Sequence, residues 1–265
     1  MPAFRMRCGS LLLAAALTPA VQAAPVNQLT DQEATNRAGQ QRMLSQRMAK
    51  SWVLQAQHAL EDEQKARLMA AQQRFEQNLA ALQPYVASRP ALQAPFAQLL
   101  GQWQRYRTLL GSAPATDRIG EILNQAGQTL ALAEAFTRQI SAGRSAVEIV
   151  NISGRQRMLS QRIVLLYASM PYLAGDAGLG QQYQQAIDQF EQGLGRLQRY
   201  PANSAEIRAR LDEVALCWRL AQEIFSDRKA RPRLMEVNAE LLLQRMEEIT
   251  ALYSRLPPLP VKKTA

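Results

Sequence analysis

Histidine and cysteine are nearly absent from this chain, and their scarcity excludes several kinds of site. The 265 residues include one histidine and two cysteines. His58 alone cannot build a multi-histidine metal centre, and no motif supports a catalytic pairing of Cys217 with His58. No phosphate-binding loop or nucleotide-binding glycine pattern occurs. We therefore expect no enzymatic activity, no cofactor and no metal site.

Aromatic residues and long apolar runs are also scarce. Aromatic residues make up 6% of the chain, and no apolar run reaches the roughly 18 residues that a membrane-spanning helix needs. The abundance of Ala, Leu, Gln, Glu and Arg favours helices over sheets. The net charge is +9, but the basic residues are dispersed and match no nucleic-acid-binding motif. We expect no nucleic-acid partner, and peripheral contact with an acidic membrane surface stays open.

The first 24 residues have the features of a secretory signal peptide. Arg5 and Arg7 precede an apolar run over 11–17, and a small-x-small pattern ends at Ala23. The sequence therefore predicts export and a periplasmic mature chain, with an uncleaved anchor as the alternative. Removal of this segment would leave Cys217 as the single cysteine, so no internal disulfide is expected.

The chain carries nearly the same octet twice, 115 positions apart. QQRMLSQR spans 40–47 and RQRMLSQR spans 155–162, and nine of the twelve positions in 36–47 recur in 151–162. Weaker matches continue downstream, where Phe75 aligns with Phe190, Trp103 with Trp218 and, after a slip of one residue, Asn124 with Asn238. Core positions drift between the halves while the octets barely do, which indicates a constraint beyond packing.

Each half predicts four helices, so we expect an all-α fold of two tandem antiparallel four-helix bundles. The expected helices run over 30–58, 61–83, 91–111 and 116–145, and then over 146–173, 179–199, 204–227 and 232–256. Thr30 and Glu33 form a capping-box pattern at the first start, and Pro84 is expected to break the second helix.

The signal-peptide pattern and the helix predictions together divide the chain into four segments. They are a signal peptide (1–24), repeat 1 (25–145), repeat 2 (146–258) and a disordered tail (259–265). No proline occurs in 141–150, which leaves open a long continuous central helix shared by the two repeats.

The octet is placed on a helix with Gly39, Arg42 and Gln46 within about 60° of one another, and with Arg47 elsewhere. A mid-helix glycine costs about 1 kcal/mol relative to alanine, which is reasonable where a ligand or another backbone must approach closely. The planar fork of an arginine suits planar oxyanions, because two N–H groups can meet two oxygens.

Two octets placed face to face would bring Arg42 and Arg157 around one point. Their repulsion in a low dielectric would be offset by a bound anion. The alternative is a solvated helix face with weak ion pairs. The sequence does not favour it, since 34–60 and 149–175 contain no carboxylate. We therefore expect the partner of these arginines to come from another helix or from a ligand.

The pattern N-x-x-G-x-x-R-M-x-S-x-R resembles the P-box of NarX- and NarQ-type nitrate/nitrite sensors. It is still more similar to the N-terminal domain of PilJ-type, type IV pili methyl-accepting chemotaxis proteins. The resemblance implies periplasmic four-helix bundles, which in the nitrate sensors bind one anion between the motif helices of a symmetric dimer. It implies ligand-binding roles for Gly39, Arg42, Gly154 and Arg157. Supporting roles fall on Asn36, Met43, Gln46, Arg47, Asn151, Met158, Gln161 and Arg162.

Two function hypotheses follow. The first is an exported sensor module that binds a small oxyanion, nitrate or nitrite above all, and signals through a membrane-bound receptor or sensor kinase. The second is a structural adaptor whose arginines pair with the carboxylates of a chemoreceptor, sensor kinase or type IV pilus component. Both invoke a separate partner, because no second membrane span or signalling domain follows Leu256 in this sequence. The duplication implies that one chain does what a dimer does in the nitrate sensors.

Overall fold

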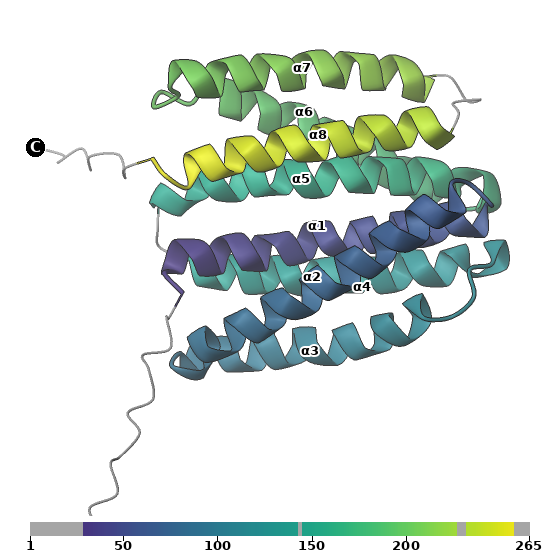
Figure 1. Cartoon of the computed structure of the whole chain (residues 1–265), viewed down its shortest axis with the longest axis horizontal. Helices are drawn as coiled ribbons and strands as arrows, with labels where there is room; N and C mark the ends of the chain where they lie inside the picture. The colour runs from purple at the N-terminus through teal and green to yellow at the C-terminus, as the bar shows by residue number, and fades with distance from the viewer. Residues whose placement is uncertain (1–28, 143–144, 227–231, 257–265) are drawn as a thin grey trace, which may run out of the picture.

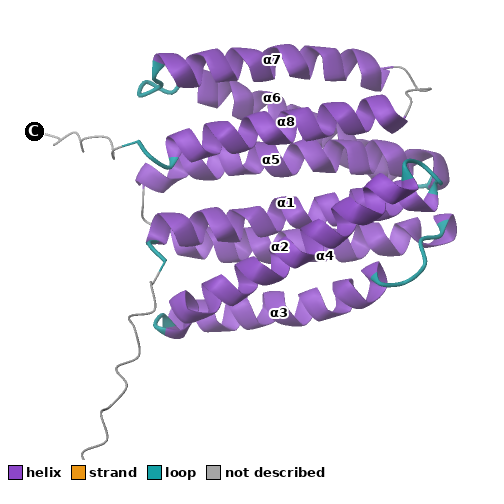
Figure 2. Ribbon diagram, viewed as in Figure 1, coloured by secondary structure: helices purple, strands orange, loops and turns teal. Residues whose placement is uncertain are grey.

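A computed structural model of the chain describes residues 29–142, 145–226 and 232–256. These residues form eight α-helices, two short 3-10 turns and connecting loops, and this part of the chain contains no strand (Figure 2). The prediction of an all-α fold is therefore confirmed.

Two four-helix bundles follow one another along the chain (Figure 1). The first bundle consists of α1 (Asp31–Ala56), α2 (Glu61–Ala87), α3 (Pro90–Leu110) and α4 (Ile119–Ser141). The second consists of α5 (Ser145–Ser169), α6 (Ala177–Gln198), α7 (Ala205–Ser226) and α8 (Pro232–Tyr253). The two octet-bearing helices, α1 and α5, pack side by side along the middle of the molecule.

Local sequence signals explain where several helices begin. The Thr30 side chain accepts a hydrogen bond from the Glu33 backbone N–H at 3.2 Å, and the Glu33 carboxylate accepts one from the Thr30 backbone N–H at 2.8 Å. This capping box starts α1 as expected. Pro90 starts α3, at a position where the missing N–H has no helical partner to lose.

The expected end of α2 before Pro84 is wrong. The helix passes through Pro84 and ends at Ala87. A proline inside a helix removes one backbone hydrogen bond. Here the next two residues, Tyr85 and Val86, are buried in the core, and their packing favours the added turn.

The continuous helix between the repeats, which the sequence left open, does not form. α4 ends at Ser141, and the backbone of Ala142 is extended, with φ −55° and ψ 131°. The physical reason is topological. α5 must run antiparallel to α4 in order to lie beside α1, so the chain has to reverse direction at this junction.

The buried positions of the two bundles correspond, and this correspondence fixes the register of the repeat. Along the second and third helices of each bundle the offset is 115 residues, as with buried Phe75 and Phe190. Along α4 and α8 the offset is 113, which aligns the buried residues Ile122, Ala126, Ala133, Phe136 and Ile140 with Met235, Ala239, Met246, Ile249 and Tyr253. The counterpart of Asn124 is therefore Val237 and not Asn238.

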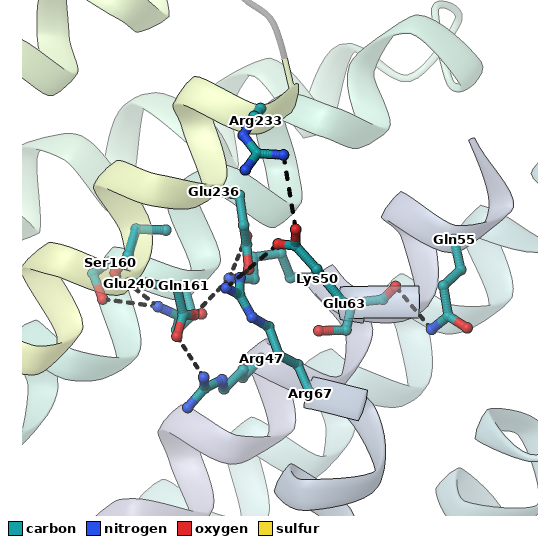
Figure 3. A network of polar contacts seen from close by, with 12 residues as sticks. Arg47, Lys50, Gln55, Glu63, Arg67, Ser160, Gln161, Arg233, Glu236 and Glu240 are labelled. Atoms are coloured by element: carbon teal, nitrogen blue, oxygen red, sulfur yellow. Dashed lines mark hydrogen bonds and ion pairs between the residues drawn. The ribbon is translucent and has the colours of Figure 1, made fainter. Parts of the chain in front are cut away.

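Charged side chains close one side of the seam between the bundles (Figure 3). Lys50 of α1 is fully buried, and its ammonium group lies 2.7 Å from Glu236 and 3.0 Å from Glu240, both on α8. Arg67 of α2 also pairs with Glu236, and Arg47 of α1 pairs with Glu240. We call these five residues the seam cluster.

The other side of the seam has no such cluster among the described residues. The counterparts of the five seam-cluster residues in the opposite repeat are Arg162, Leu165, Gln182, Leu123 and Gly127. A cleft of about 520 Å³ lies there, and Leu123, Gly127 and Gln182 are among its lining residues. The two sides of the seam therefore differ: the seam cluster closes one side, whereas the other contains this cleft, with Glu134 of α4 pairing with Arg155 of α5 between the bundles.

Two predicted segments fall outside the described residues, namely the signal peptide (1–24) and the tail (259–265). Along 29–142, 145–226 and 232–256, we find no helix with the length and apolar character of a bilayer span. Within these ranges there is also no cluster of three or more His, Cys, Asp or Glu side chains placed to hold a metal ion.

Candidate functional site

Each octet arginine folds back over the glycine one turn before it. A methyl group added at Gly39 would lie 3.1 Å from Arg42 Nη2, and one added at Gly154 would lie 3.2 Å from Arg157 Nη2. Arg42 Nε also donates to the Gly39 carbonyl oxygen at 3.4 Å. These mid-helix glycines therefore make room first of all for the chain's own guanidinium groups, which approach the helix backbone closely.

The two arginines meet at the seam between α1 and α5. The point occupied by a methyl group at Gly154 is 3.3 Å from Arg42 Nη2, almost as close as it is to Arg157 Nη2. Arg42 is 1% exposed and Arg157 is 3% exposed. Two cations thus share a water-poor site, which is costly unless anions or hydrogen-bond acceptors compensate them.

The two arginines are compensated unequally. Arg42 Nη1 lies 2.7 Å from a carboxylate oxygen of Glu134 on α4, and Arg155 pairs with the other oxygen of that carboxylate. Arg157 Nη2 donates to the neutral Asn36 side-chain oxygen at 2.9 Å. Its Nε is buried without a hydrogen-bond partner, and among the described residues no carboxylate pairs with it.

The pKa shifts follow from this arrangement. Burial would raise the pKa of Glu134, but the charges of Arg42 and Arg155 outweigh it and hold that pKa below its usual range. Burial lowers the pKa of Arg157 to about 10, with Glu247 only partly opposing the effect and the charge of Arg42 adding to it. Arg157 therefore remains a cation at neutral pH, and it is the less well compensated of the two arginines.

The repeat shows why the halves differ. At the offset of 113, the counterpart of Glu134 is Glu247, which is exposed and forms no ion pair with Arg157 in the described part of the chain. The counterpart of Arg155 is Gln40, which carries no charge to draw Glu247 inward. Asn151, the counterpart of Asn36, has a buried side-chain oxygen without a partner.

The family comparison agrees with the duplicated architecture. A family model described as type IV pili methyl-accepting chemotaxis transducer N-terminal domain, PilJ, matches residues 27–136 and again residues 139–237. The chain belongs to this family. The prediction of two PilJ-type copies is confirmed, while the domain limits 25–145 and 146–258 stay predictions. No curated protein and no solved structure matches the chain.

Membership of the PilJ-type family assigns a coarse role. Its domains form the sensory N-terminal part of chemotaxis transducers, so the chain is a sensory-type domain of chemoreceptor signalling.

Several supporting residues of the PilJ-type octets make structural contacts. The Gln46 amide donates to the Ala126 carbonyl oxygen on α4 at 3.1 Å, and Gln161 donates to its counterpart Ala239 on α8 at the same distance. Ser45 Oγ donates to the Arg42 carbonyl oxygen in the same way as Ser160 Oγ donates to that of Arg157. The supporting role of Gln46 at a ligand site stays a prediction, and in this structure its amide group is bonded to α4.

The remaining supporting residues lie in the core or across the seam. Met43 and Met158 are buried. Arg162 donates to the side-chain oxygens of Gln46 and Gln182, both at 3.0 Å, whereas Arg47 belongs to the seam cluster. These contacts tie the motif helices to their neighbours and explain part of the resistance of the octets to change.

Sequence reasoning missed Glu134 and Arg155. Helix α4 contains only two carboxylates, Glu121 and Glu134, and the second has a counterpart in Glu247. A register of 113 along the fourth helices would have revealed a carboxylate retained in both repeats. The alignment with a slip of one residue concealed it.

Proposed function

We propose that this chain is an exported, periplasmic sensor module that binds one small oxyanion between α1 and α5. Nitrate and nitrite are the first candidates, since they are planar and singly charged and a guanidinium fork can meet two of their oxygens. The module signals through a separate membrane-bound chemoreceptor or sensor kinase. Membership of a chemotaxis transducer family supports the sensory part of this proposal.

The observation that carries the proposal is the state of Arg157. The residue is 3% exposed, and its guanidinium group shares its site with Arg42 and donates to the neutral amide of Asn36. A buried cation without a carboxylate is destabilising, and binding an anion removes that cost. The empty site would be destabilised and the anion-bound site stabilised, and such a difference between two states is what a ligand-driven sensor needs.

The test is thermal unfolding of residues 25–265 at constant ionic strength in nitrate, nitrite, chloride, sulfate or acetate. A ligand at 100 times its dissociation constant adds about 2.7 kcal/mol to the free energy of unfolding, or several degrees in Tm. We expect a shift with nitrate or nitrite that both Arg42→Ala and Arg157→Ala abolish. If no anion produces a specific shift, or if both variants become more stable, an adaptor that pairs these arginines with a partner's carboxylates replaces the sensor.

A further inference from the structure

Glu134 engages one of the two terminal nitrogens of Arg42, an arginine of the proposed anion site. Arg42 offers two terminal nitrogens, of which Nη1 lies 2.7 Å from Glu134 while Nη2 faces the shared point over Gly154. We infer that Glu134 is an internal counter-ion that limits the two-arginine site to one singly charged anion, held mainly by Arg157. This inference rests on the proposed function and names the charge class of its ligand.

The charges around the site support a single negative charge on the ligand. Arg42 and Arg157 are buried cations, whereas Arg155 is 43% exposed and is partly solvated. Glu134 already compensates Arg42 and bonds to Arg155. One further negative charge compensates Arg157. A second would enter a low-dielectric site with no buried cation left to meet it.

The duplication explains how this counter-ion arose on one side only. Glu134 and Glu247 are counterparts, and so are Arg155 and Gln40. Where the arginine is present, the carboxylate is held at the seam, 2.7 Å from Arg42. Where glutamine replaces it, Glu247 is exposed. Arg155 is therefore a positioning residue that acts through Glu134, and Glu247 provides a matched control within the same chain.

The first experiment compares sodium nitrate with sodium sulfate by titration calorimetry at constant ionic strength. The proteins are residues 25–265 as the native sequence and as Glu134→Gln and Glu247→Gln. A unit charge about 4–6 Å away changes the binding of an anion by about a hundredfold to a thousandfold per unit of anion charge at an effective dielectric constant of ~20. We expect the native chain to prefer nitrate, Glu134→Gln to gain sulfate affinity by at least that factor, and Glu247→Gln to keep the native preference.

The outcomes separate this inference from the proposed function. If the native chain binds nitrate but Glu134→Gln leaves the nitrate-to-sulfate ratio unchanged, or if Glu247→Gln changes it equally, the counter-ion role is overturned and the sensor stands. If the native chain binds neither anion while Glu134→Gln binds sulfate, the counter-ion role holds and the sensor proposal falls. Binding by none of the three proteins overturns both.

A second pair of variants keeps the inference testable if Glu134→Gln does not fold. Arg42→Gln leaves Glu134 paired with the half-exposed Arg155 alone, so its negative charge, no longer met by a buried cation, should repel nitrate and abolish its binding. Adding Glu134→Gln to that variant removes the charge and should restore nitrate affinity to within about tenfold of the native value, because Arg157 is intact. A double variant that binds no better than Arg42→Gln alone contradicts the counter-ion role.

Discussion

Arg42 and Arg157 direct their Nη2 atoms toward the same point, 3.3 Å and 3.2 Å from a methyl group placed at Gly154. The two residues are 115 positions apart, yet both guanidinium groups lie against the space that the missing side chain of Gly154 leaves free. This relationship makes the glycines as informative as the arginines, because a single methyl group perturbs the site without removing a charge.

Gly154→Ala should separate stability from anion binding. A mid-helix glycine to alanine change stabilises by up to about 1 kcal/mol, but here the methyl group would push both Nη2 atoms back by a few tenths of an ångström and fill the space between them. We expect the anion-specific Tm shift to disappear in Gly154→Ala while the fold is retained. Gly101 of α3 has no heavy atom within 4 Å of an added methyl group, so Gly101→Ala should gain stability and keep the shift. Survival of the shift in Gly154→Ala would show that the anion is bound elsewhere.

The two counterpart asparagines should differ in their contribution to stability. Asn36 accepts the hydrogen bond of Arg157 at 2.9 Å, whereas the Asn151 side-chain oxygen is buried without a partner. Removing an acceptor from a buried charged donor costs about 1–3 kcal/mol. Urea unfolding should therefore show this loss for Asn36→Ala and a much smaller one for Asn151→Ala. Equal losses would mean that the hydrogen bond does not distinguish the two halves.

The seam cluster should tolerate joint replacement better than single replacement. Lys50→Leu leaves Glu236 buried with Arg67 as its remaining cation, and breaking a buried ion pair in this way costs about 3–5 kcal/mol. The opposite repeat has leucine at both corresponding positions, Leu165 and Leu123. The double variant Lys50→Leu, Glu236→Leu should therefore recover most of the loss in a denaturant titration. A double variant as unstable as Lys50→Leu would rule out this account of the seam.

Acid should weaken the seam. Burial alone would raise the pKa of Glu236, but Lys50 foremost, with Gln64 and Arg67, holds it below its ordinary value of 4.5. Because the folded-state pKa is the lower one, the stabilisation is present above about pH 4.5 and is lost as the pH falls through the folded value. Unfolding free energies measured from pH 7 to pH 3 should fall more steeply for the native chain than for the Lys50→Leu, Glu236→Leu variant. Parallel pH profiles would assign the acid sensitivity to other carboxylates.

The sequence predicted the architecture because the helical pattern and the repeated octet carry strong local information. Residue spacing alone predicted four helices in each repeat, the capping box at Thr30, and the close approach of Arg42 to Arg157. The continuation of α2 through Pro84 did not, since it depends on the burial of Tyr85 and Val86 after the helix has packed.

The charge balance of the site could not be read from the sequence. Glu134 reaches Arg42 across 92 positions, and Arg157 lacks the same partner because Gln40 stands where Arg155 stands in the other repeat. Such an asymmetry depends on which side chains face the seam in three dimensions. The contacts of Gln46 and Gln161 with Ala126 and Ala239 could not be predicted for the same reason, since helix geometry gives the direction of a side chain but not the carbonyl oxygen that it meets.

The covalent fusion of the two octets has a genetic consequence. In a symmetric dimer, one codon specifies both arginines of the site, so every mutation appears twice and the two halves cannot diverge. Here Arg42 and Arg157 are encoded separately, and so are Glu134 and Glu247. A single mutation can therefore alter one half of the site while the other is inherited unchanged, which lets selection adjust the charge of the site one unit at a time.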